Sequence, residues 1–330
     1  MTPSAREAPL VRVENLSVYF NAGRAGFWGQ KQLRVHAVEG LGFDIFPGET
    51  LGLVGESGSG KSTTGRAILG RVPVSEGRIF FRGEEISHAD REKNRQLSKH
   101  MQLVFQDPYA SLNPRMKIVD IVAEPLLVHG RVKRPKEAVE TVSRLLERVG
   151  LPPDALDRYP HAFSGGQRQR VGIARAIALK PEFIVADEPV SALDVSIRAQ
   201  VVNLLQDLQA EFGIAYLFIA HDLAVVRHIS HRIAIMYAGK IVELAPRALI
   251  YDRPVHPYTQ ALLSAVPVPD PPVQRARKRI IYAGEPPNPL EPPPGCRFQS
   301  RCPFVDRHCV QNAPPLTERE AGQWAACWNC

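Results

Sequence analysis

Residues 55–62 form a glycine-rich segment, GESGSGKS, with the spacing G-x-x-x-x-G-K-S. Glycines at such positions let backbone N–H groups turn inward around phosphate oxygens, where a larger side chain would collide. Lys61 can reach the β- and γ-phosphates of a nucleotide, and the Ser62 hydroxyl can bind Mg²⁺. A flexible Gly-Ser turn with a chance lysine is the alternative interpretation. The predicted nucleotide contacts here are Gly55, Glu56, Ser57, Gly58, Ser59, Gly60, Lys61, Ser62 and Thr63.

The flanks of this phosphate-binding loop (residues 55–62) favour the phosphate interpretation over the chance turn. Residues 50–54 form a short apolar run that predicts a buried strand, and residues 63–69 predict a helix. The N-terminus of a helix attracts anions, because its first N–H groups have no partners within the helix and its dipole is positive there. Strand, loop and helix therefore occur in the order that a phosphate site needs.

Two adjacent carboxylates follow another predicted strand, residues 183–186. In enzymes with this type of loop, an Asp at a strand end holds Mg²⁺, so Asp187 is the predicted metal ligand. Glu188 stands one residue further along, where a base can orient or deprotonate the attacking water. On its own, such a pair would more often belong to a solvated loop, but the phosphate-binding loop upstream favours the catalytic interpretation.

The elements that must position these residues alternate along the chain. Further strands are predicted at residues 11–20, 33–38, 101–105 and 215–219, and helices at 136–149 and 167–178. Residues 21–31 are rich in glycine and polar residues and predict a loop. Strands that alternate with helices predict an α/β fold around a mostly parallel sheet.

Length and composition bound the classes of protein that this chain can belong to. The 330 residues suggest roughly two domains, and 44% hydrophobic with 23% charged residues exclude a disordered or fibrous chain. No apolar run approaches the ~20 residues of a membrane-spanning helix, and no secretory signal is visible. We therefore expect a cytosolic protein, or one docked on a membrane from the cytosolic side. The net charge of +7 decides nothing alone.

Composition changes after residue 252, where we place a domain boundary. Ten of the 28 residues from 267 to 294 are proline, which predicts an extended segment without helix or sheet. All five cysteines lie beyond it, at positions 296, 302, 309, 327 and 330. Thiols crowded at one end of a cytosolic chain suggest a metal site more than a disulfide framework.

The segment FSGGQRQR, residues 163–170, completes the pattern that points to a family. With the two motifs above, it resembles the signature motif of ATP-binding cassette ATPases, whose usual form begins with Leu where this chain has Phe163. Further resemblances follow in order: Gln106 is similar to the family's Q-loop glutamine, residues 191–194 to its D-loop, and His221 to its switch histidine. Phe20, with Tyr19 beside it, is similar to the aromatic residue that stacks on adenine.

This resemblance implies an α/β fold of the P-loop NTPase class. It implies a RecA-like core, a helical subdomain at about residues 106–163 and an N-terminal antiparallel β part, all within residues 1–252. Two cassettes would enclose two ATP molecules head to tail. Glu188, His221 and Gln106 would be catalytic, and Ser62, Gln106 and Asp187 would hold Mg²⁺. The residues expected to complete the partner's site are Ser164, Gly165, Gly166 and Gln167, with Asp194 in the D-loop.

Residues 253–330 resemble the C-terminal module of oligopeptide and dipeptide permease ATPases, on the segments RPVHPYTQALL, GCRF and RCP. The resemblance implies a [4Fe–4S] cluster on four thiolates; zinc and unligated thiols remain alternatives. The cysteines that would hold it are Cys296, Cys302, Cys309 and Cys327, with Cys330 left over. The His-Pro-Tyr at 256–258 predicts only a helix start, with Pro257 in the first turn.

The function that the resemblance implies is the ATP-hydrolysing subunit of a di- or oligopeptide importer, peripheral on the cytoplasmic face of the cell (inner) membrane. Its partners would be a second cassette (a paralogue or itself), two integral membrane permease subunits and an extracytoplasmic substrate-binding protein. The same ATPase could serve nickel, glutathione or sugar import, because the ATPase does not touch the cargo. A soluble cassette ATPase acting on nucleic acid is a further alternative; we expect no nucleic-acid partner.

Overall fold

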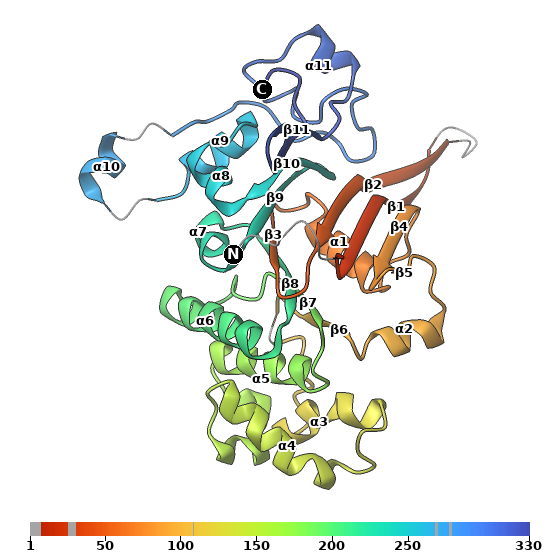
Figure 1. Ribbon diagram of the computed structural model, residues 1–330, viewed down its shortest axis with the longest axis vertical. Helices are drawn as coiled ribbons and strands as arrows, with labels where there is room; N and C mark the ends of the chain where they lie inside the picture. The colour runs from red at the N-terminus through yellow and green to blue at the C-terminus, as the bar shows by residue number, and fades with distance from the viewer. Residues whose placement is uncertain (1–7, 26–30, 108, 268–269, 277–278) are drawn as a thin grey trace. The chain divides into compact units, whose positions relative to one another are not determined.

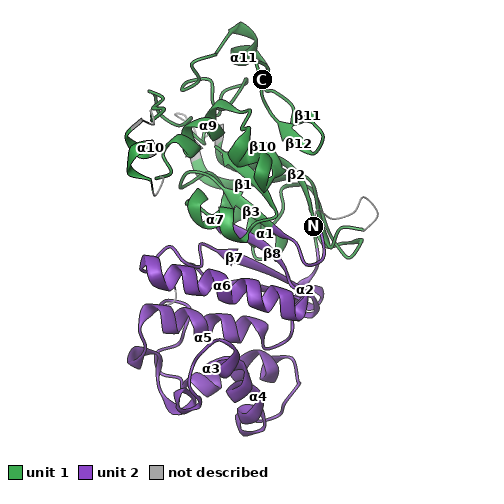
Figure 2. Cartoon of the chain, turned by 60° about the vertical axis from the view of Figure 1, so that its left-hand side comes forward, with its two compact units in different colours: residues 1–45, 51–88, 220–330 green, residues 46–50, 89–219 purple. Residues whose placement is uncertain are grey.

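The computed structural model describes residues 8–25, 31–107, 109–267, 270–276 and 279–330 (Figure 1). The chain divides into two compact units (Figure 2). The first comprises residues 1–45, 51–88 and 220–330, and the second comprises residues 46–50 and 89–219. Each unit is described separately below.

The first unit contains an antiparallel sheet with the strand order β2-β1-β4-β5. Its strands are β1 (Val11–Ala25), β2 (Lys31–Ile45), β4 (Glu76–Phe81) and β5 (Glu84–Glu85). The prediction of a loop from residue 21 is wrong for residues 21–25, while residues 26–30 lie outside the described part. Asn21 pairs with Arg34, and the register shift after it accommodates Gly23, whose φ is +103°. Cross-strand pairing thus extends the strand through residues of low strand propensity.

The first unit also carries strands in the order β11-β12-β10-β9-β3. Their bounds are β3 (Thr50–Val54), β9 (Arg232–Tyr237), β10 (Lys240–Pro246), β11 (Thr317–Glu320) and β12 (Gln323–Ala325). The β3–β9 pair is parallel and the other pairs are antiparallel. All of β3 is buried, as its apolar run predicts.

The helices of the first unit are short. They are α1 (Lys61–Ile68), α7 (Leu223–Ile229), α8 (Arg247–Asp252), α9 (Pro257–Ser264), α10 (Pro271–Ala276) and α11 (Arg307–Gln311). Helix α10 corrects the prediction that the proline-rich segment contains no helix. Pro271 and Pro272 stand in its first turn, where a missing N–H costs nothing because no partner exists for it.

The second unit holds parallel strands in the order β8-β7-β6 and the helices of the chain's middle. The strands are β6 (Met101–Val104), β7 (Phe183–Asp187) and β8 (Ala215–Ala220). The helices are α2 (Arg91–Leu97), α3 (Ile118–Val128), α4 (Pro135–Arg148), α5 (Gly165–Ile177) and α6 (Val195–Phe212), with 3₁₀ turns at Pro153–Asp157 and Pro160–Ala162. Helices α3, α4 and α5 pack on one another through buried apolar faces that include Val122 and Val142. No helix in the described residues is long and apolar enough to cross a bilayer.

A fully buried carboxylate on β10 adds to the pairing of β12 with β10 in holding the C-terminal residues. Glu243 accepts hydrogen bonds from the backbone N–H groups of Val255 and His256, both at 3.0 Å, and from the Gln323 side chain at 2.9 Å. Since residues 220–330 cluster with the N-terminal strands, the boundary predicted at residue 252 is not a division between compact units, and it stays a prediction.

His256 confirms the predicted helix start and gives the unit a pH-dependent stability. Its Nδ1 accepts the Tyr258 N–H at 3.1 Å, Pro257 occupies the first position of α9, and burial lowers the pKa of His256 to about 3. In the unfolded chain the His256 imidazole takes up a proton once the pH falls below its ordinary pKa of 6.5. In the folded chain the same imidazole stays neutral down to about pH 3. Stability is therefore lost as the pH falls, by about 2 kcal/mol at pH 5 from this residue alone.

The test compares the free energy of unfolding of the wild type and His256→Asn from pH 7.5 to 5. Asparagine keeps a side-chain acceptor at the N-cap but does not titrate. We expect the wild type to lose about 2 kcal/mol more than the variant over this range. Parallel pH profiles would contradict this account of His256.

Candidate functional site

The phosphate-binding loop lies between β3 and α1, and its glycines are required by close backbone contacts. Gly60 has φ +98°, and a Cβ there would lie 2.2 Å from the Ala37 carbonyl oxygen. A Cβ at Gly55 would lie 2.1 Å from the Met236 carbonyl oxygen. Gly58 also has a positive φ, of +79°. Any side chain at residues 55 or 60 would therefore push the loop away from the strands that support it.

The Lys61 side chain folds back over this loop and forms hydrogen bonds with its backbone. The Lys61 Nζ donates to the carbonyl oxygens of Gly55 at 2.8 Å and Glu56 at 2.7 Å, and the side chain is buried. The N–H of Gly239, in the turn after β9, donates to the Ser59 carbonyl at 3.0 Å. The loop is thus held in a curved shape with a positive charge at its centre, at the N-terminus of α1, which is an arrangement that suits phosphate oxygens.

The predicted catalytic glutamate lies at the end of β7 with an unusual backbone conformation. Glu188 has φ +46°, a region that non-glycine residues rarely occupy, and its N–H donates to the Ile219 carbonyl at 3.0 Å. The Gln106 Nε2 donates to the Glu188 Oε2 at 3.2 Å. Asp187, the last residue of β7, is buried. A strained backbone conformation persists only where the surrounding structure holds it in place, and such conformations occur most often at functional sites.

The signature segment begins helix α5 with a reciprocal cap. The N–H of Gln167 donates to the Ser164 hydroxyl at 3.4 Å, and the Ser164 N–H donates to the Gln167 side chain at 3.0 Å. A Cβ on Gly166 would lie 2.4 Å from the Ile197 side chain of α6, so glycine allows the two helices to approach closely. The Phe163 that departs from the family pattern is buried, so it serves the packing beneath the signature rather than its exposed end.

Three further predicted residues lie at element ends or on exposed surface. Asp194 is the N-cap residue of α6, and His221 follows β8 with its side chain exposed. Phe20 is 41% exposed on β1, whereas the hydroxyl of the neighbouring Tyr19 donates to Glu76 at 3.3 Å. This exposure agrees with the choice of Phe20 as the stacking residue, which stays a prediction.

The predicted residues are divided between the two units. The first unit holds Phe20, residues 55–63 and His221. The second holds Gln106, Asp187, Glu188, Asp194 and the signature residues. Within the second unit, the structure brings Gln106 and Glu188 into contact. Two residues that the sequence did not assign to a site, Tyr258 and Arg301, contact Glu56 in the first unit.

The C-terminal cysteines do not form a metal site in the described residues, although neighbouring thiols affect one another's pKa. Burial and the neighbouring thiols of Cys309, Cys302 and Cys327 raise the pKa of Cys296 to about 11. A hydrogen bond with Cys330 lowers the pKa of Cys327 to about 6. However, no group of three or more His, Cys, Asp or Glu side chains in the described part of the chain is placed as ligands of one metal ion.

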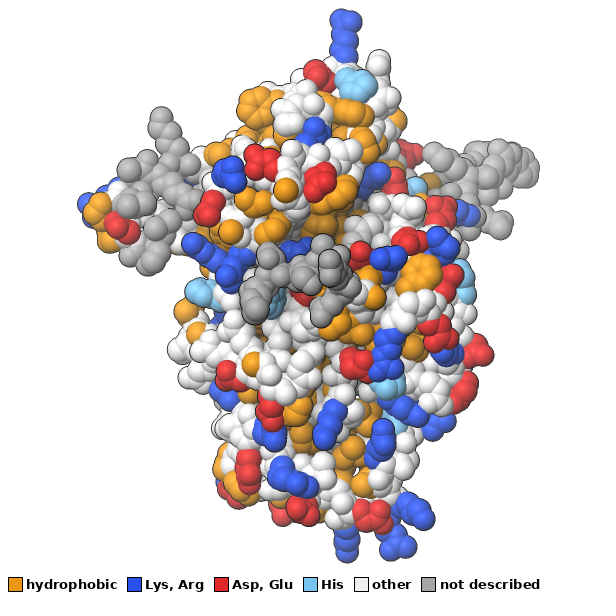
Figure 3. Space-filling view, in the orientation of Figure 1, with side chains coloured by type: hydrophobic (Ala, Val, Ile, Leu, Met, Phe, Trp, Pro, Cys, Tyr) orange, Lys and Arg blue, Asp and Glu red, His pale blue; other side chains and the backbone are white. Residues whose placement is uncertain are grey.

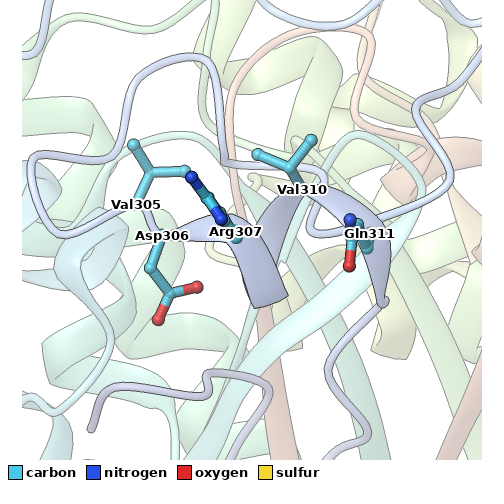
Figure 4. Close-up of a pocket in the computed structure, with 5 residues that line it drawn as sticks. All are labelled: Val305, Asp306, Arg307, Val310 and Gln311. Carbon is cyan, nitrogen blue, oxygen red and sulfur yellow. The ribbon is translucent and has the colours of Figure 1, made fainter.

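A cavity of about 410 Å³ lies in the C-terminal region (Figure 4). It is lined by Val305, Asp306, Arg307, Val310 and Gln311, around helix α11. Asp306 caps that helix by accepting the Cys309 N–H at 2.8 Å, so its carboxylate has a structural role. None of the predicted nucleotide-site residues lines this cavity.

Comparison with known proteins identifies the family of the chain. Residues 38–191 match the family described as ABC transporter, and residues 242–309 match the C-terminal region of oligopeptide/dipeptide transporters. The oligopeptide transport ATP-binding protein AppF of Bacillus subtilis (strain 168) is 50% identical, over 98% of each chain. The glutathione import ATP-binding protein GsiA of Escherichia coli O157:H7 is 56% identical over 85% of this chain and 45% of GsiA.

A solved structure gives the same fold. The dimeric, post-hydrolysis form of the ATP-binding cassette MJ0796, bound to ADP and Pi, has a TM-score of 0.62 and 28% identity, covering 72% of this chain and 98% of that one. Fold and motifs together define an ATP-binding cassette ATPase. The chain belongs to the family of oligopeptide/dipeptide ABC transporter ATP-binding proteins.

Proposed function

We propose that this chain hydrolyses ATP to drive the import of di- or oligopeptides through a membrane ABC transporter. The observation that carries the proposal is the 50% identity to an oligopeptide transport ATP-binding protein over 98% of the chain. The C-terminal match to the oligopeptide/dipeptide region supports the same cargo class. The motif residues are all present, so we infer an active ATPase.

In this proposal each site residue has a defined task. Lys61 and the N–H groups of the phosphate-binding loop bind the β- and γ-phosphates. Glu188 accepts a proton from, or orients, the attacking water, and His221 holds the γ-phosphate and water in line. The hydroxyl of Ser62, the Asp187 carboxylate and the Gln106 amide oxygen are the hard oxygen donors that Mg²⁺ prefers. When bound, Mg²⁺ would neutralise charge on the phosphates.

We propose that the chain works as half of a cassette dimer, with itself or a paralogue. The dimeric form of MJ0796 supports this arrangement. The signature residues Ser164 to Gln167, of which Ser164 and Gln167 are exposed, would then complete the ATP site of the partner. Two membrane permease subunits and an extracytoplasmic binding protein would carry the cargo, and the chain would lie on the cytoplasmic face of the membrane.

The cargo is tested by uptake in a strain that lacks this gene and has no redundant permease. The strain, complemented with the wild-type chain, is given a labelled dipeptide with an excess of unlabelled peptides, glutathione, nickel or a sugar. We expect peptides to abolish the labelled uptake and the other competitors to leave it unchanged. The relative GsiA is named as a glutathione import protein. If glutathione alone reduced the labelled uptake, the proposed cargo would therefore be glutathione.

The face of the molecule drawn in Figure 3 gives no support to a nucleic-acid function. On the face drawn in Figure 3, Lys and Arg side chains are interspersed with Asp and Glu rather than gathered into one basic patch. Since the phosphate backbone is bound mainly by clustered positive charge, we retain the expectation of no nucleic-acid partner.

We also propose that Cys296, Cys302, Cys309 and Cys327 hold a [4Fe–4S] cluster; four thiolates are the ligands that such a cluster takes, although the described residues do not place them as one ligand set. Protein purified without oxygen is analysed for iron, sulfide and zinc. We expect about four iron atoms and four sulfides per chain, reduced in Cys302→Ser and retained in Cys330→Ser. Zinc in place of iron, or neither metal, would exclude the cluster.

A further inference from the structure

The C-terminal region contacts the phosphate-binding loop through an ion pair. The Nη1 of Arg301 lies 2.9 and 3.1 Å from the two carboxylate oxygens of Glu56, the second residue of the loop. The Arg301 side chain is 19% exposed and that of Glu56 is 36% exposed, so water screens the pair only in part. The guanidinium also lies within 6.0 Å of the ring centres of Tyr237 and Phe298.

A second contact holds the backbone of the same loop residue. The Glu56 N–H donates to the Tyr258 hydroxyl at 3.1 Å. Tyr258 is fully buried, on α9, and its ring packs against those of Tyr237 and Phe298 at 4.7 and 5.5 Å. Because this aromatic cluster is buried, the hydroxyl is fixed where it meets the loop.

Glu56 is thus held from three sides. Its carboxylate pairs with Arg301, and its N–H donates to the Tyr258 hydroxyl. Its carbonyl oxygen accepts a hydrogen bond from the Lys61 ammonium at 2.7 Å. Two of these three partners come from residues beyond 252, so the C-terminal region helps to set the conformation of the loop.

The C-terminal region also contacts the strand that supports the loop. Gly60 rests against the Ala37 carbonyl, and Glu39, two residues further along β2, forms an ion pair with Arg297. The Arg297 side chain is buried, and Lys240 lies 3.1 Å from the other oxygen of Glu39. The turn that carries Arg297 and Arg301 therefore contacts both the loop, through Arg301, and its supporting strand β2, through Arg297.

The charge of Glu56 makes the Arg301 contact relevant to nucleotide binding. A carboxylate inside a loop that receives polyphosphate repels the ligand unless a cation neutralises it. The Lys61 ammonium binds the loop carbonyls and, in the proposed site, the phosphates. Arg301 is therefore the cation that neutralises the Glu56 carboxylate. We propose that Arg301 and Tyr258 are positioning residues for the phosphate-binding loop, through which the folded C-terminal region sets the affinity for ATP. This inference rests on the proposed role of residues 55–62 in ATP binding.

The experiment measures the Kd of a fluorescent ATP analogue, and the KM and kcat of ATP hydrolysis, with the full-length chain. Arg301→Ala is expected to raise Kd and KM about 3- to 10-fold and to leave kcat at saturating ATP unchanged. Tyr258→Phe, which keeps the ring, is expected to shift Kd in the same direction. The matched control is Arg253→Ala, which removes an exposed arginine paired with Glu320 in the same region.

Rescue separates charge compensation from a general loss of structure. Glu56→Gln in the Arg301→Ala background removes the uncompensated carboxylate, so the double variant should bind nearly as tightly as the wild type. Arg301→Lys should restore part of the affinity. A Kd that stays raised in the double variant would overturn the charge argument, as would equal Kd values for the wild type and Arg301→Ala.

Lys61→Ala distinguishes the failure of this inference from the failure of the proposed site. If Lys61→Ala binds the analogue normally, the loop is not the phosphate site, and both proposals fail. If Lys61→Ala loses binding while Arg301→Ala and Tyr258→Phe match the wild type, only the positioning role fails.

Discussion

The Glu188→Gln variant is expected to bind ATP as well as the wild type and to hydrolyse it about 10²- to 10⁴-fold more slowly. The amide cannot take a proton from water, but its oxygen can still accept the Gln106 hydrogen bond that the structure records at 3.2 Å. With hydrolysis blocked, the ATP-bound cassette dimer should accumulate. Phosphate release gives the rate, and size-exclusion chromatography with ATP detects the dimer.

Glu182→Gln is the matched control for this variant. Glu182 precedes β7, is half-buried, and its carboxylate lies 3.1 Å from the Nδ1 of His100. The same chemical change there should leave the rate of hydrolysis near that of the wild type. Equal rates for Glu188→Gln and Glu182→Gln would show that Glu188 is not the catalytic base.

The Lys61→Ala variant is expected to lose nucleotide affinity by about 10- to 150-fold, the equivalent of ~1.5–3 kcal/mol for a charge-assisted hydrogen bond. Two effects add: the phosphates lose a cation, and the loop loses the bonds from Nζ to the carbonyls of Gly55 and Glu56. Calorimetric titration with ATP gives the affinity. Lys136→Ala, an exposed position on α4, is the control. Wild-type affinity in Lys61→Ala would contradict the assignment of the loop.

The elements around the site were predictable because their sequence signals are local. The apolar run of β3, the Gly-rich loop and the start of α1 follow one another without interruption, and the structure has them within about two residues of the predicted bounds. The same holds for β7, where a buried run ends at Asp187. Propensity and burial agree at these positions, so local reasoning succeeds.

Local reasoning failed where partners distant in sequence decide the conformation. Residues 21–25 form strand because they pair with β2, although their composition favours a loop. The positive φ of Glu188 and its contact with Gln106 depend on how strands β6, β7 and β8 align. Arg301 and Glu56 are 245 residues apart, and no spacing rule joins them. The sequence shows an arginine, Arg301, beside Cys302, but its pairing with Glu56 cannot be predicted without knowledge of the fold.

The most direct test of the account is peptide uptake in the gene-deleted strain, complemented with either the wild-type chain or Glu188→Gln at equal expression. We predict that the wild type restores uptake of a labelled dipeptide and that Glu188→Gln does not, although the variant protein is folded and binds ATP. Uptake restored equally by Glu188→Gln would contradict the claim that ATP hydrolysis by this chain powers peptide import.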